Sequence, residues 1–315
     1  MAATALSYER QGTLSAVGSR SADLVDKTMD LYLKREEKVP LHMAKYFSRH
    51  SPKTTNFKLT TIGSELTFPR ERTDTSPIPY VEPPPGYDVN WDMVTYQSGI
   101  KVTEALSKFE LSGQLGFICS GLPASFRKFY EYAMANVVET ASSTAGADGS
   151  YGYGTDHYLT GLGAGTWSNV ETGAALSSTS VNSMAVSMAN RKDQQGFVSG
   201  ITLMKIIGPP ALREKLVQIS QTDKVPESNV NAVNAYKGID YEVIPYFTTS
   251  STAFYGIGDL PEARNGLHLI EWQAPKITGL GQDPNQPLIV KRFHGYARFQ
   301  AGLSVIYNSH RNAGA

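Results

Sequence analysis

The sequence has one cysteine and no surplus of either charge. Cys119 has no partner for a disulfide within the chain, so a disulfide-stapled fold is excluded. The 29 Lys and Arg residues equal the 29 Asp and Glu residues, which gives a formal net charge of zero. This balance argues against a nucleic-acid-binding protein, which normally has a basic surplus. It suits a protein that lives in an assembly, because proteins near neutrality associate readily.

Signals for secretion and for membrane insertion are also missing. The first ten residues lack a basic stretch followed by an apolar one, so no signal peptide is expected. No run of about 18 apolar residues occurs, so the sequence predicts no membrane span and no membrane partner.

The motifs of common hydrolases and metal sites are absent as well. None of the six histidines pairs with another at the i, i+4 spacing of a zinc hydrolase, and no Gly-x-Ser-x-Gly elbow is present. His268 alternates with leucines on a predicted strand, which indicates a surface or interface histidine rather than a ligand. Glu36 and Glu37 fit a solvated helix end better than a metal site.

Cys119 is the one conceivable nucleophile. A helix is predicted to begin just after it, and a helix N-terminus lowers the pKa of a thiol. The run Phe117–Cys119 is apolar, however, which favours a buried structural thiol. The sequence therefore predicts no catalytic, cofactor-binding or metal-binding residue and no cofactor.

A glycine-rich tract over residues 143–175 includes the run Gly161-Leu-Gly-Ala-Gly165. A phosphate-binding glycine loop must follow a strand and open a helix, and a P-loop needs a Lys-Ser or Lys-Thr pair. The residues after the run contain another glycine and show no helical face, and no Lys-Ser or Lys-Thr pair follows the run. The run predicts a flexible surface loop.

The central stretch Ile201–Pro245 predicts a compact α/β unit. Its first seven residues form an apolar, β-branched run that is too short for a helix, which indicates a buried strand. Gly208 and Pro209 end that strand, and Pro210 suits the first turn of a helix whose apolar face is Leu212, Leu216 and Ile219. An Asn-rich loop then leads to a second strand over 239–244.

Helices and strands are predicted on both sides of this stretch. Helices are expected over 22–38, 120–142 and 176–193, the second with Pro123 in its first turn. Residues 57–103 predict a long two-stranded projection with a proline-stiffened tip. C-terminal strands are expected over 252–258, 267–272, 288–293 and 298–307, with a loop over 275–287 and a polar tail after 307.

Charge is distributed unevenly near the N-terminus. Residues 1–58 hold ten basic and six acidic side chains, a net of +4, whereas residues 59–92 hold two and six, a net of −4. Two such segments can be surfaces that meet, within one subunit or between subunits. Ordinary scatter of solvated charge is the alternative.

The order of these elements resembles that of tailed-phage major capsid proteins of the Hong Kong 97 type. Four stretches carry the resemblance through their order and spacing. They are Ile206–Leu212 (strand, Pro-Pro, helix), Asn231–Pro245 (Asn-rich loop, Gly, strand, Pro), Val94–Glu104 (the strand returning from the projection) and Phe293–Gly302 (the closing strands).

The resemblance implies an α+β Hong Kong 97-like capsid fold with named parts. These are an N-terminal arm (1–56), a long β-hairpin called the E-loop (57–92), a peripheral domain with a spine helix (93–144 and 261–315), and an axial domain (145–260). The spine helix would run over about 122–142. Some members of the family join a Lys near the E-loop tip to an Asn, but residues 59–92 contain no Lys and Lys58 lies at the base. No covalent cross-link is therefore expected.

By this resemblance the chain is a non-enzymatic capsid protein of a virion, assembled in the host cytoplasm. Hexamers and pentamers of it would build an icosahedral shell that encloses the phage double-stranded DNA without sequence-specific binding. A separate scaffolding protein, a portal and cement proteins are the implied partners. Two alternatives stay open: an encapsulin-like nanocompartment shell protein, and a soluble α/β enzyme with Cys119 as nucleophile.

Overall fold

The computed structural model describes residues 41–61, 86–103, 114–158, 165–192, 198–226, 232–259, 266–280 and 289–315. The predicted helix over 22–38, the tip of the predicted projection and most of the 161–165 glycine run lie outside these residues. Among the described helices, none has the length and apolar character needed to cross a bilayer.

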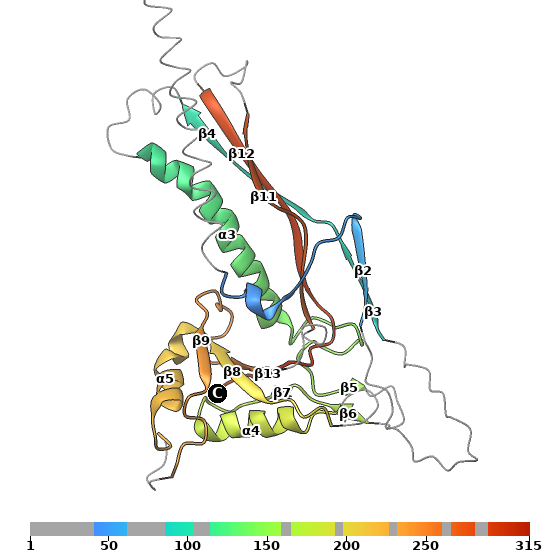
Figure 1. The fold of residues 1–315 in the computed structure, drawn as a ribbon, viewed down its shortest axis with the longest axis vertical. Helices are drawn as coiled ribbons and strands as arrows, with labels where there is room; N and C mark the ends of the chain where they lie inside the picture. Colours follow the sequence, from blue (N-terminus) through green and yellow to red (C-terminus); the bar gives the residue numbers. More distant parts are fainter. Residues whose placement is uncertain are drawn as a thin grey trace, which may run out of the picture. The chain divides into compact units, whose positions relative to one another are not determined.

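The described elements combine one long helix, several short ones and several sheets (Figure 1). The helices are η1 (Ala44–Tyr46), α3 (Gln114–Thr140), α4 (Ser178–Ala189), η2 (Pro210–Leu212) and α5 (Arg213–Gln221). The first strands are β1 (Ser48–His50), β2 (Asn56–Thr60), β3 (Asp88–Asp92), β4 (Thr95–Thr103), β5 (His157–Tyr158), β6 (Thr166–Trp167) and β7 (Val170–Glu171). The later strands are β8 (Leu203–Gly208), β9 (Asp240–Val243), β10 (Phe254–Gly258), β11 (Leu267–Leu280), β12 (Ile289–Leu303) and β13 (Ser309–Asn312).

The chain divides into two compact units. The described part of the first comes from Met93–Tyr130 and Glu271–Phe299, and the second from His42–Asp92, Glu131–Ile270 and Gln300–Ala315. In the first unit, β4 pairs antiparallel with β12, and α3 runs beside them (Figure 1).

The contact between α3 and β12 depends on aromatic side chains and one glycine. The ring of Phe126 fills the space where Gly295 would carry a Cβ, 2.4 Å from the nearest ring atom. One turn along, Tyr130 stacks on Phe299 with ring centroids 3.9 Å apart. Leu122, Phe126 and Tyr130 of this helix are accordingly buried in the core.

The second unit is built on a five-stranded sheet in the order β7-β13-β10-β8-β9. Parallel strands β8 and β9 flank the α5 connection, which confirms the predicted strand, turn, helix and strand. Helices α4 and α5 pack on this sheet around one apolar cluster, which includes Met184, Leu216 and Phe254. Ser177 caps α4 through a capping box with Ser180, as Ser and Thr do at helix starts.

The β2–β3 hairpin belongs to the second unit. Asn56–Thr60 pairs antiparallel with Asp88–Asp92, so the predicted two-stranded hairpin is present at its base. The returning strand is β3, however, and not the predicted stretch from Val94, which forms β4 in a different sheet. Lys58 and Asp88, one from the basic segment and one from the acidic segment, form an ion pair of 2.7 Å within the subunit.

Four predictions about the bounds of elements were wrong. The long helix begins at Gln114 and not at 120, so Pro123 lies inside it and Cys119 is a helical residue. Strand β11 continues to Leu280 through part of the predicted 275–287 loop, and β12 is one strand where two were predicted. The supposed polar tail contains β13, whose Ser309, His310 and Asn312 are fully buried.

Candidate functional site

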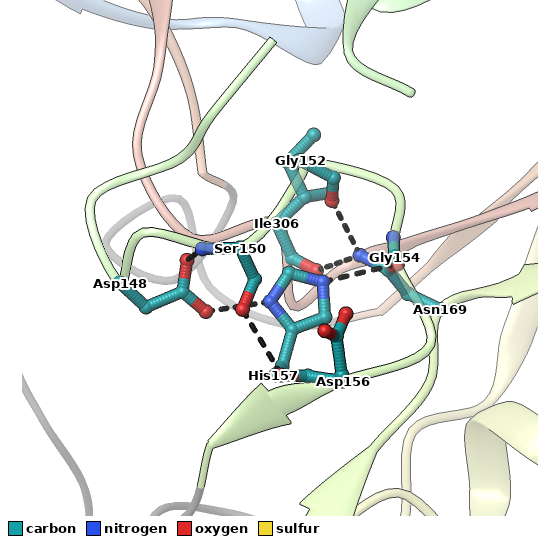
Figure 2. A network of polar contacts seen from close by, with 8 residues as sticks. All are labelled: Asp148, Ser150, Gly152, Gly154, Asp156, His157, Asn169 and Ile306. Carbon is teal, nitrogen blue, oxygen red and sulfur yellow. Dashed lines mark hydrogen bonds and ion pairs between the residues drawn. The ribbon is translucent and has the colours of Figure 1, made fainter. Parts of the chain in front are cut away.

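The most polar part of the interior surrounds His157 (Figure 2). A turn places Asp148 beside it: Gly149 adopts a left-handed φ of +81°, and the Asp148 carboxylate accepts the N–H of Ser150 at 3.2 Å. Strand β5 then carries His157 against β6, where its ring stacks on Trp167 with centroids 4.3 Å apart. The side chains of His157 and Asp148 are both buried, and Nδ1 lies 2.6 Å from Asp148 Oδ2.

Asn169 fixes the other side of the imidazole. Its Nδ2 donates to the carbonyl oxygens of Gly152 and Ile306 at 2.7 and 3.0 Å, so its Oδ1 must be the atom that accepts the N–H of Gly154 at 2.8 Å. The same Oδ1 lies 3.2 Å from His157 Nε2. Both ring nitrogens of His157 therefore face oxygen atoms, Asp148 Oδ2 on one side and Asn169 Oδ1 on the other.

This group joins segments without supplying a reaction. An Asp-His pair can activate a hydroxyl nucleophile, but only if the second ring nitrogen is free to take a proton. Here the amide oxygen of Asn169 lies 3.2 Å from that nitrogen, and the nearby Ser150 hydroxyl donates instead to the Asp156 carbonyl at 3.0 Å. The network holds the 144–157 loop, β6 and the chain before β13 in one arrangement.

Asn169 is expected to be a major contributor to stability. Asn169→Ala removes two donors and one shared acceptor from a site where the side chain is fully buried. Because each buried polar group left unpaired costs about 1–3 kcal/mol, we expect a loss of about 3–5 kcal/mol in the free energy of unfolding. Urea denaturation followed by circular dichroism measures it. Asn136→Ala, on the exposed side of α3, is the matched control and should stay within about 0.5 kcal/mol of wild type. Equal stabilities for the two variants would contradict the assignment.

A buried guanidinium lies next to this network. Arg191, 2% exposed, follows α4 and donates to the carbonyl oxygens of Tyr307 and Ser309, and to Nδ1 of His310 at 3.0 Å. Its guanidinium lies 5.2 Å from the centre of the Trp167 ring. Burial lowers the pKa of Arg191 to about 10, so it stays charged at neutral pH. The guanidinium thus pins the C-terminal strand to the end of α4.

A carboxylate performs the same task at α3. Glu139, 7% exposed, accepts the backbone N–H groups of Thr248, Thr249 and Ser250 at 2.8–3.3 Å, and also the Thr249 hydroxyl. Successive N–H groups that converge in this way form an anion-binding nest. Glu139 fills the nest from within the chain and ties the loop after β9 to the helix.

The structure changes the interpretation of Cys119 and His268. Cys119 lies within α3 and does not precede it, so the argument from a helix N-terminus fails. His268 was predicted to be a surface or interface histidine, but it is 3% exposed within the single subunit and contacts His50 and Ser304. That prediction was wrong because both faces of β11 are covered at this point. Within the described residues, no three His, Cys, Asp or Glu side chains gather in a way that could hold a metal ion.

Sequence reasoning missed these buried polar groups. They are Asp148, His157 and Asn169 of the network and the adjacent Arg191 and His310, and none belongs to a spaced motif. The one local signal was the Asp148-Gly149 pair, which is typical of a turn.

Comparisons with known proteins give a match in structure and none in sequence. No protein-family model matches the chain, and no curated protein matches it significantly. The fold is similar to the capsid of a native GTA particle (TM-score 0.55, 10% identity, 87% of this chain and 89% of the other). It is also similar to a chain from Microbacterium phage Oxtober96 (TM-score 0.53, 9% identity, 88% of both chains).

The chain has the phage-capsid fold. This confirms the α+β class and the capsid fold predicted from the order of elements, whereas the named parts of that fold stay predictions. The capsid fold extends beyond phages: the holo-encapsulin complex from Synechococcus elongatus is similar as well (TM-score 0.50, 7% identity, 87% of both chains). At these identities the likeness concerns the fold alone.

Proposed function

We propose that the chain is the major capsid protein of a tailed double-stranded-DNA phage, a structural subunit without enzymatic activity. The observation that carries this is the extent of the fold match, which takes in 87–88% of the chain and 88–89% of the two phage-type capsid chains. In the buried Asp148–His157 pair, the Asn169 amide oxygen lies at Nε2 of the imidazole, which is consistent with a structural role.

The proposed parts follow the Hong Kong 97 layout. The arm is 1–56, the E-loop 57–92, the peripheral domain with the spine helix 93–144 and 261–315, and the axial domain 145–260. Pairing of β2 with β3 at the base of the 57–92 segment supports an E-loop there. Arm and E-loop would reach neighbouring subunits, and many weak contacts of this kind become cooperative because each is made at high effective concentration.

The proposed assembly is an icosahedral shell of hexamers and pentamers within the virion. It forms in the host cytoplasm with a separate scaffolding protein, a portal and cement proteins, and it encloses DNA without reading its sequence. Zero net charge supports a container of this kind, because a strongly basic wall would grip phosphates. Lys58 already pairs with Asp88, which supports a shell without Lys–Asn cross-links.

An encapsulin-like compartment is the second candidate, favoured by the similarity to the Synechococcus elongatus complex. The two candidates differ in what the shell encloses. Particles from phage-producing cells are expected to hold nuclease-protected double-stranded DNA of uniform length, measured by gel electrophoresis after nuclease treatment and protein digestion. Particles that hold a folded protein and no protected DNA would overturn the phage proposal in favour of the compartment.

A further inference from the structure

One face of the β2–β3 hairpin packs on two histidines of the second unit. We name the resulting cluster the hairpin seat; it consists of Phe57 and Trp91 of the hairpin together with His50, His268 and Ser304. Trp91 is 6% exposed, whereas the alternate residues of β2 and β3 are exposed and polar. The indole lies directly on the backbone of Gly302, where a Cβ would come within 2.2 Å of Nε1. The hairpin is therefore held through this aromatic face.

Two imidazoles lie between the hairpin and the strands that support it. His50 ends β1, and its ring centroid lies 5.0 Å from that of Phe57 in β2. His268 in β11 lies 5.6 Å from Trp91 in β3, again between centroids. Strands β1 and β11 pair in parallel and bring the two histidines side by side. Both strands of the hairpin thus contact an imidazole.

The two rings are hydrogen-bonded to each other. His50 Nε2 lies 3.1 Å from His268 Nδ1, and His268 Nε2 lies 2.8 Å from the Ser304 hydroxyl. The first contact requires one nitrogen to donate and the other to accept, so at most one of the two rings can be an imidazolium. Protonating both rings turns the contact into two opposed N–H donors and places two positive charges against each other.

Burial makes the second of those charges costly. His268 is 3% exposed, and burial together with the neighbouring His50 lowers its pKa to about 4. Burial also lowers the pKa of His50, which is partly exposed. The groups that face the pair from the hairpin and from the end of β12 are Phe57, Trp91 and Ser304, which do not titrate in this range. Within the described residues, His50 is the charge that acts on His268.

We propose that His50 and His268 form a pH-sensitive latch that seats the β2–β3 hairpin. When both are neutral, their hydrogen bond and the contacts to Phe57 and Trp91 hold the hairpin on β1 and β11. When acid protonates both, the contact becomes repulsive and the hairpin leaves its seat while the five-stranded sheet stays folded. The inference concerns the isolated subunit and holds whichever shell the chain builds.

Hydrogen exchange on the full-length chain tests the latch. Amide exchange of 56–60 and 88–92 is measured by mass spectrometry between pH 7 and pH 4.5 and corrected for the intrinsic effect of pH. We expect exchange in both strands of the wild type at pH 4.5 to be at least ten-fold faster than in His268→Gln, which keeps a partner for Ser304 and cannot become charged. Strand β8 should exchange alike in the two proteins, because acid effects on the rest of the unit are common to both. His294→Gln, a histidine of the other unit, should leave the response intact.

Three results would overturn the latch. The first is a hairpin whose corrected exchange does not change with pH. The second is an acid response of the same size in His268→Gln; if that variant does not fold at pH 7, His50→Gln takes its place, because its amide can still donate to a neutral His268. The third is exchange in β8 that differs between wild type and His268→Gln as much as exchange in the hairpin does, which would show general unfolding and no local release.

Discussion

Deleting residues 309–315 is expected to leave the second unit unable to fold. These residues include β13, which lies between β7 and β10 in the five-stranded sheet and is not an edge strand. Its removal exposes the inner edges of both neighbours and takes away two of the acceptors of the buried Arg191 guanidinium. Leaving a buried charge without partners costs about 3–5 kcal/mol by itself.

The total loss exceeds what a domain of this size can tolerate. Folded proteins are stable by only about 5–15 kcal/mol. Besides leaving the Arg191 guanidinium without two acceptors, the deletion leaves backbone groups of β7 and β10 unpaired and exposes part of the core. Soluble expression and the thermal unfolding transition measure the result. Deleting Ala315 alone, an exposed residue, is the control and should leave both unchanged. A truncated chain that is soluble and melts like wild type would show that β13 is dispensable.

Acid is expected to destabilise the same strand through His310. Its Nδ1 accepts from Arg191, and burial together with the charge of Arg191 lowers its pKa to about 3. The unfolded chain, with a pKa near 6.5, takes up the proton first as the pH falls. Above pH 6.5 the residue is neutral in both states and has no effect. Between pH 6.5 and pH 3 stability is lost at about 1.4 kcal/mol per unit, or about 3 kcal/mol at pH 4.

His310→Asn separates this effect from other acid effects. The Asn side chain can place an oxygen near the position of Nδ1, so it keeps an acceptor for Arg191 but does not titrate. We expect the variant to lose much less stability than wild type between pH 7 and pH 4, measured by urea unfolding at each pH. Asn136→Ala, on the exposed side of α3, changes no titratable group and should follow wild type. Identical pH profiles for wild type and His310→Asn would refute the assignment.

The core of the second unit could be predicted because its signals are local. Strand β8 is a short apolar run, Gly208 and Pro209 end it, and the face of α5 repeats at helical spacing. Each element carries its own boundary in the sequence, and the parallel pairing of β8 with β9 follows from the helix between them. The capsid fold could be inferred because the order of such elements is distinctive, even though the sequence pattern of each single element occurs in many other folds.

Element ends and the polar interior could not be predicted, for a different reason. Proline is favoured in the first turn of a helix, so Pro123 suggested a start that the observed helix contradicts. Strand β11 passes through Pro275 because its pairing with neighbours, which local propensity does not reveal, decides where it ends. Asn169 bonds to Ile306 across 137 residues of chain, and no spacing rule spans such a contact.

The central claim is that this chain assembles into a closed shell, and electron cryomicroscopy of the purified protein tests it most directly. The account predicts closed particles whose reconstruction shows five-fold and six-fold groups of subunits with the capsid fold, each subunit contacting its neighbours through the 57–92 segment. A monodisperse monomer that forms no particles, under conditions where the chain is folded and with or without a scaffolding protein from the same phage, would contradict it.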